Sequence, residues 1–181
     1  MARPSTAARR YAEAAFELAT RDGTFDAWRD DLALAANLVS AERVARIVES
    51  PARPIAERRA VLERLLGGRV SQPVRNLARL LTERGRVDLL PAIAGEYRRL
   101  LHRRRGVVEA VVTSAVPLTA EETAAVTARV EAMSGAAVEL SSVVDASLIG
   151  GLTIRVGDRL LDASVRGRLE RLRDQLVAGA R

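Results

Sequence analysis

Cysteine and lysine are absent from this chain of 181 residues, and aromatic residues make up only 3% of it. Without cysteine, a disulfide framework and a thiolate metal site are both excluded. Without lysine, the phosphate-binding loop of the Walker type is excluded, because that loop needs its lysine. With so few aromatic rings, alanine, leucine and valine must build the core, which suits helices packed closely through small side chains.

Long apolar runs are lacking as well. No segment approaches the roughly 18 apolar residues that a membrane-spanning helix needs. The first residues, from Met1 to Ala7, lack the apolar core of a secretory signal. From these features we expect a soluble chain without a cleaved leader.

The charge is unbalanced, with 29 basic residues against 23 acidic ones and a net charge of +6. Such a balance can indicate a nucleic acid or an acidic partner surface. The arginines, however, alternate with acidic residues, as in 57–59 and 168–171, which is typical of solvated helix faces. We favour solvated surfaces, and a basic helical protein that binds nucleic acid through the run Arg103–Arg105 remains the alternative.

Helical periodicity with short turn signals extends from Pro4 to about residue 105. It predicts helices over residues 4–21, from 24 or 26 to beyond 38, 41–49, 54–66, 71–84 and 87–104. From Gly106 the pattern predicts strands over 107–115, 138–144 and 152–156, then a tight turn at Asp158 into 159–161. It also predicts one helix from a capping box at Thr119 and another that begins at Ser164. The fold class is therefore α+β, with an N-terminal six-helix bundle over 1–105 and a small α/β domain over 106–181.

Residues able to carry catalysis are few. The pairs Gly67–Gly68 and Gly150–Gly151 lack the spacing of a dinucleotide fingerprint, and we interpret them as a helix stop and a close backbone approach. His102, the single histidine, precedes an arginine run, and we interpret it as an exposed residue at a helix end. With one histidine and no cysteine, we expect no metal site, no cofactor and no active site.

The first helix carries two apolar stripes. Ala8, Ala12, Ala15 and Ala19 form the first stripe; Tyr11, Ala14 and Leu18 form the second. A helix buried centrally in its own bundle would show this pattern. A helix with one face inward and the other in a groove for a partner helix would show it too. The spacing does not decide between them.

The most informative segments are residues 10–19, residues 76–86, and the C-terminal stretch 145–158 with its continuation 162–169. These segments resemble the delta subunits of F-type ATP synthases, the family of the mitochondrial oligomycin-sensitivity-conferring protein. The last of these is the most specific, and the similarity covers nearly the whole chain in the family's order.

The resemblance implies a non-catalytic stator subunit that ties the catalytic head to the peripheral stalk. Its N-terminal bundle would bind the N-terminal helix of an alpha subunit, and its C-terminal domain would bind the b subunits of the stalk. The helix-binding groove, carried over, would be lined by Tyr11, Ala14, Ala15, Leu18, Leu77, Leu80 and Leu81. We also expect one copy per complex, on the cytoplasmic face of a bacterial plasma membrane, with membrane contact only through the complex. A general helical adaptor unrelated to ATP synthase remains a second alternative.

Overall fold

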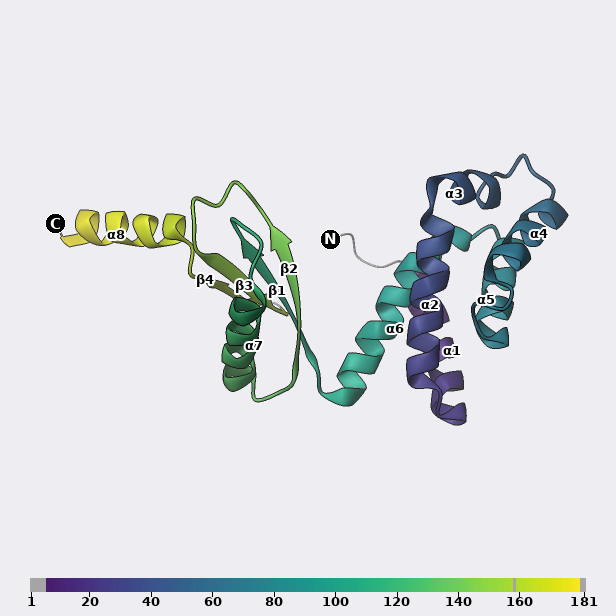
Figure 1. Cartoon of the computed structure of the whole chain (residues 1–181), viewed down its shortest axis with the longest axis horizontal. Helices are drawn as coiled ribbons and strands as arrows, with labels where there is room; N and C mark the ends of the chain where they lie inside the picture. The colour runs from purple at the N-terminus through teal and green to yellow at the C-terminus, as the bar shows by residue number, and fades with distance from the viewer. Residues whose placement is uncertain (1–5, 158, 180–181) are drawn as a thin grey trace. The chain divides into compact units, whose positions relative to one another are not determined.

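The computed structural model describes residues 6–157 and 159–179. Contacts between Cα atoms divide the chain into two compact units, Met1–Leu101 and His102–Arg181, and each is described by itself. Two sequence expectations, the helix start at Pro4 and the turn residue Asp158, lie outside the described residues. Figure 1 labels the helices and strands in chain order.

The first unit is helical. Its elements are α1 (Thr6–Asp22), α2 (Phe25–Ser40), α3 (Glu42–Val48), α4 (Ile55–Leu66), α5 (Gln72–Glu83), a 3₁₀ turn η1 (Val87–Leu89) and α6 (Leu90–Arg105), whose last turn belongs to the second unit. Gly68 follows α4 with a φ of +69°, so the interpretation of the first glycine pair as a helix stop is confirmed.

One hydrophobic core joins these helices. The alanine stripe of α1 lies inside it, with Ala8, Ala12 and Ala19 fully buried. Four of the few aromatic rings gather here, since Phe16 contacts both Phe25 and Tyr97, and Trp28 stacks on Tyr97. The Tyr97 hydroxyl donates a hydrogen bond to the carbonyl of Phe25 at 3.1 Å, which satisfies its polar end inside the bundle.

The sixth helix differs from its sequence expectation. The periodicity predicts one helix from residue 87, whereas the structure begins with the 3₁₀ turn η1 before α6. The Leu89 N–H bonds to the Arg86 carbonyl, three residues back. Pro91 occupies the second position of α6, where a missing N–H costs little, so the proline falls inside the first α-helical turn.

The second unit contains a four-stranded sheet in the order β2-β1-β3-β4. Its strands are β1 (Val108–Ser114), β2 (Val138–Val144), β3 (Leu152–Val156) and β4 (Arg159–Asp162). The pair β1 and β2 is parallel and is connected through α7 (Ala120–Ser134), which packs on the sheet, while the other pairs are antiparallel (Figure 1). A small core of Ala110, Val112, Val130 and Ile154 holds α7 on the sheet.

The capping box that the sequence predicts at the start of α7 is confirmed. The Glu122 N–H donates to the Thr119 hydroxyl, and the Thr119 N–H donates to the Glu122 carboxylate. Two N–H groups that the helix cannot satisfy are thereby paired, which fixes where α7 begins.

Two turns that bracket β3 and β4 hold the final helix, α8 (Val165–Gly179). Gly151 has a φ of +75°, and a Cβ on it would lie 2.5 Å from the Ala163 carbonyl oxygen, so the predicted close backbone approach is confirmed. The Asp162 carboxylate accepts from the Ser164 N–H, and the Ser164 hydroxyl caps α8 by accepting from Gly167. Gly151, Asp162 and Ser164, in the C-terminal stretch that resembles the family, are thus explained by the close packing of the backbone at the start of α8.

The whole is an α+β fold, as the sequence predicts. Among residues 6–157 and 159–179, no helix combines the length and the apolar character needed to cross a bilayer.

Candidate functional site

An open groove lies between α1 and α5 in the first unit. Its cavity measures about 540 Å³ and its lining is mostly apolar. We call it the α1–α5 groove and define it by its lining residues: Tyr11, Ala14, Ala15, Leu18, Arg21, Asp22, Trp28, Gln72, Pro73, Asn76, Leu77 and Leu80.

The two apolar stripes of α1 explain one wall of the groove. The alanine stripe faces the core, as its burial shows. The stripe of Tyr11, Ala14 and Leu18 faces outward: Ala14 is exposed and Leu18 is 40% exposed. The structure therefore excludes a helix buried on all sides, which the spacing alone allowed.

The opposite wall is built by α5 on the same principle. Val74, Ala78 and Leu81 face the core, while Pro73, Leu77 and Leu80 follow each other at helical spacing along the groove. Leu80 is 39% exposed. A single leucine with this exposed fraction is common on protein surfaces. Here, however, apolar residues line both facing helices and form a continuous apolar channel.

The structure places six of the seven predicted groove residues in the lining. They are Tyr11, Ala14, Ala15, Leu18, Leu77 and Leu80. Leu81 is corrected: it is fully buried in the hydrophobic core and does not line the groove. The reason is the helical period, since Leu81 lies about 100° around α5 from Leu80 and so shares the inward face with Val74 and Ala78.

Sequence reasoning missed the polar residues of the groove lining and its floor. At the end of α1, Arg21 Nε lies 2.9 Å from the carboxylate of Asp22, and this hydrogen bond lowers the pKa of that carboxyl. On α5, Gln72 donates to the side chain of Asn76 at 2.9 Å. Trp28 lies at the floor, only 4% exposed. As the single tryptophan on a predicted helix face, it was the one signal in the sequence that could have suggested this place.

His102 is also placed differently from its sequence interpretation. It lies in the last turn of α6, as expected, but its side chain is only 12% exposed and is therefore not a solvated helix-end residue. Its two ring nitrogens lie beside carboxylates that come from strands β1 and β2.

The fold and the groove together define a two-unit α+β protein with a surface suited to docking another chain. A family model described as the ATP synthase delta (OSCP) subunit matches residues 7–176. The chain is similar to "ATP synthase subunit delta" of Synechococcus elongatus, 41% identical over 170 residues that cover 93% of this chain and 94% of the relative. A second relative of the same name, from Laribacter hongkongensis, is 42% identical over 93% of this chain and 95% of its own.

A solved structure matches nearly the whole chain as well. A chain in the cryo-EM structure of the Toxoplasma gondii mitochondrial ATP synthase hexamer matches with a TM-score of 0.71 at 25% identity, covering 96% of this chain and 98% of that one. The chain belongs to the ATP synthase delta (OSCP) subunit family. It is a structural, non-catalytic subunit of the ATP synthase and serves in its stator.

Proposed function

We propose that this chain holds the catalytic head by binding the N-terminal helix of an alpha subunit in the α1–α5 groove. The observation that carries the proposal is the groove itself, an apolar channel between two helices whose inward faces already fill the core. An amphipathic helix laid into such a channel buries its apolar stripe against the two walls, which is a recurring mode of peptide recognition.

The lining of the groove determines which side chains the bound helix must carry. Arg21, Asp22, Gln72 and Asn76 are the polar residues in an otherwise apolar lining. A partner helix therefore needs apolar residues that recur about every three to four positions and form one face, with polar side chains along its flanks. The specific residues that we assign to the contact are Tyr11, Ala14, Ala15, Leu18, Leu77 and Leu80.

We further propose a division of labour between two domains, a helical bundle of α1–α6 over residues 1–105 for the head and residues 106–181 for the b subunits of the stalk. In the second unit, exposed apolar side chains occur on the segments next to the junction where the Gly150 carbonyl accepts from the Val165 N–H. Their exposed fractions are 69% for Ile149, 65% for Leu160, 55% for Leu169 and 42% for Val165. Exposed apolar side chains are typical of surfaces that another chain covers when they form one patch, and these residues support the proposal on that ground.

The mechanical role explains why contact area matters more than chemistry here. While the rotor turns, the stator must resist torque, because slippage would uncouple proton flow from nucleotide chemistry. Resistance requires extended apolar and ionic interfaces at both ends of the subunit. We place the subunit, one copy per complex, on the cytoplasmic face of a bacterial plasma membrane, held there by its partners.

Paired leucine variants test the head contact. Leu80 in the groove and Leu34 on α2 are 39% and 38% exposed, and Leu34 does not line the groove. Leu80→Glu should weaken binding of a synthetic alpha N-terminal peptide by at least about ten-fold in calorimetry, since the complex would bury a carboxylate. Leu34→Glu should bind like the unmodified chain, and equal binding by both variants would refute the groove.

A second pair tests the stalk contact separately. Leu160→Glu should abolish pull-down of a soluble b-subunit fragment and leave binding of the alpha peptide intact. Met133, exposed by 54% at the end of α7, provides the control as Met133→Glu. Loss of b binding in both variants, or in neither, would contradict the assignment of this surface.

A further inference from the structure

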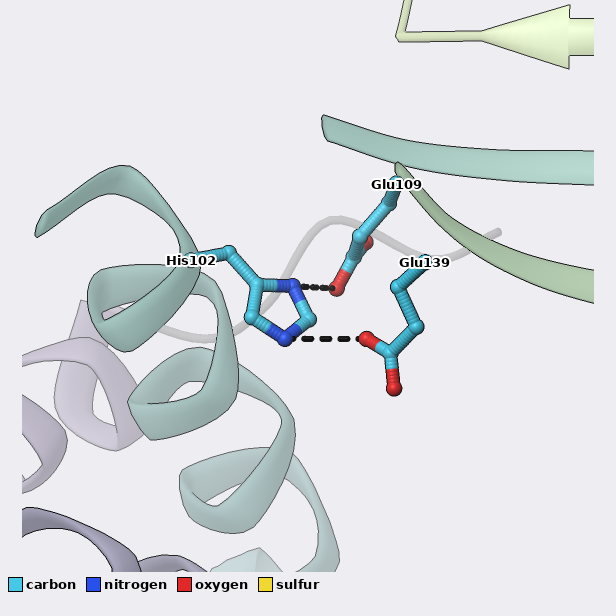
Figure 2. A group of neighbouring side chains, drawn as sticks. All are labelled: His102, Glu109 and Glu139. Atoms are coloured by element: carbon cyan, nitrogen blue, oxygen red, sulfur yellow. Dashed lines mark ion pairs between the residues drawn. The ribbon is translucent and has the colours of Figure 1, made fainter. Parts of the chain in front are cut away.

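His102 lies between two glutamates in the second unit, as Figure 2 shows. His102 belongs to the last turn of α6, Glu109 to β1 and Glu139 to β2. The imidazole Nδ1 is 3.1 Å from the Glu109 carboxylate, and Nε2 is 2.9 Å from the Glu139 carboxylate. Three segments of the chain thus converge on one imidazole ring.

The sheet register brings the two glutamates together. β1 and β2 are parallel, and Glu109 is the direct partner of Glu139 in their ladder. Side chains of paired residues project from the same face of a sheet, so the two carboxylates are neighbours. Two neighbouring carboxylates repel each other, and a cation beside them lowers that repulsion.

One ring nitrogen of His102, Nδ1, lies close to a carboxylate but makes no well-aligned hydrogen bond with it. The side chain of His102 is 12% exposed. Its Nδ1 atom is buried and has no hydrogen-bond partner among the described residues, although Glu109 is 3.1 Å away. The carboxylate oxygen therefore lies off the direction in which an N–H would point. A metal ion about 2.0–2.2 Å from both atoms also lies off the line that joins them, so this arrangement suits chelation.

We propose that His102, Glu109 and Glu139 bind a divalent transition metal of the zinc class. One ring nitrogen and one oxygen from each glutamate would be the protein ligands, with water completing the coordination. The three donor atoms lie within 4.8 Å of one another. Ligands about 2.0–2.2 Å from a common zinc ion are at most about 4.4 Å apart. The two carboxylates lie beside different ring nitrogens, so an ion bound to one nitrogen requires the exposed glutamate beside the other nitrogen to rotate toward it.

The donor set decides which metals fit. Imidazole with carboxylates suits zinc, cobalt and nickel, whereas magnesium and calcium prefer oxygen ligands alone. Glu109 and Glu139 are 44% and 53% exposed, and the arginine run 103–105 adjoins the site in sequence. Both features weaken cation binding, so we expect micromolar rather than nanomolar affinity. The bound ion would join the last turn of α6 to β1 and β2, a function beyond the stator contacts.

A zinc titration followed by NMR tests the proposal on the full chain, produced without a histidine tag and stripped with EDTA. Because His102 is the only histidine, its imidazole signals need no assignment. Zinc chloride should shift them saturably at one equivalent, and magnesium chloride should not shift them. If the imidazole only rests between two carboxylates, zinc leaves its signals unmoved up to millimolar concentration, and the proposal is overturned.

Three variants locate the ligands. Glu109→Gln and Glu139→Gln should each weaken zinc binding by at least about ten-fold, as loss of a ligand or of its supporting carboxylate does. Glu121→Gln, at an exposed position in the first turn of α7, is the matched control and should bind zinc like the unmodified chain. Far-UV circular dichroism checks that each variant folds. Binding that is equal in all three variants would refute the site, and the titration of the unmodified chain decides the question even where a variant fails to fold.

Discussion

Replacing Ala14 with aspartate separates docking from folding in the α1–α5 groove. Ala14 is exposed in the free chain and lines the groove, one turn from both Tyr11 and Leu18. The new carboxylate stays hydrated, so the free energy of unfolding should fall by less than about 1 kcal/mol, mostly through the lower helix propensity of aspartate. The variant should therefore fold and melt almost like the unmodified chain.

Binding responds differently, because an apolar partner helix would bury that carboxylate without a counter-charge. We expect the affinity for an alpha N-terminal peptide to fall by at least ten-fold, which corresponds to about 1.4 kcal/mol. An ion pair with Arg10, four residues earlier, would recover only about 0.3–0.5 kcal/mol. Calorimetry measures the affinity, and the fluorescence of Trp28 at the floor of the groove gives an independent signal.

Two matched substitutions complete the experiment. Ala33→Asp, at an exposed position of α2 outside the groove, should preserve both stability and binding. Ala12→Asp places the charge in the core, where Ala12 is fully buried, and should unfold the first unit. If Ala14→Asp also unfolds the chain, or if it folds and binds the peptide normally, our assignment of the outward face of α1 is refuted.

Four further expectations follow from the fold. The purified chain should show no ATPase activity and bind no nucleotide specifically, and saturable nucleotide binding in calorimetry would contradict this. Limited trypsin digestion should cut near residues 104–106 and release a stable, almost wholly helical N-terminal fragment. A fragment that unfolds would argue against two independent domains. Gly151→Ala should destabilise the chain by more than about 2 kcal/mol in chemical denaturation, against about 1 kcal/mol for Gly135→Ala, whose Cβ would meet open space. Hydrogen bonds from Ser147 lower the pKa of Asp145, so the carboxylate stabilises the fold at pH values above the ordinary carboxyl pKa, and this contribution is lost as the pH falls. The stability deficit of Asp145→Asn should therefore shrink in acid, and a deficit independent of pH would refute the effect.

The order and type of the secondary-structure elements could be predicted from the sequence because local signals specify them. Glycines end helices at positive φ, the capping box at Thr119 starts α7, and β-branched residues mark β1. The 3₁₀ turn η1 was missed, since a single turn leaves the apolar period almost unchanged. The resemblance to the delta family also rests on sequence alone, because the segment 145–158 encodes a junction with strict backbone requirements.

The direction of each helix face could not be predicted in the same way. Both stripes of α1 are apolar, and only packing against the other helices shows that the alanines lie inside and Ala14 and Leu18 outside. Leu80 and Leu81 are neighbours in sequence with the same chemistry, yet one lines the groove and the other fills the core. A hydrophobic pattern records that a side chain avoids water, and does not record whether its own chain or a partner covers it.

The surroundings of His102 were decided by tertiary structure alone. In sequence the residue adjoins arginines, which predicts an exposed helix end. In the fold, the parallel pairing of β1 with β2 places Glu109 beside Glu139 and brings both to the imidazole. Sequence therefore determined the elements and the family of this protein, because these depend on short-range patterns. Sheet register and helix packing determined the groove and the histidine cluster, because both join residues that are distant along the chain.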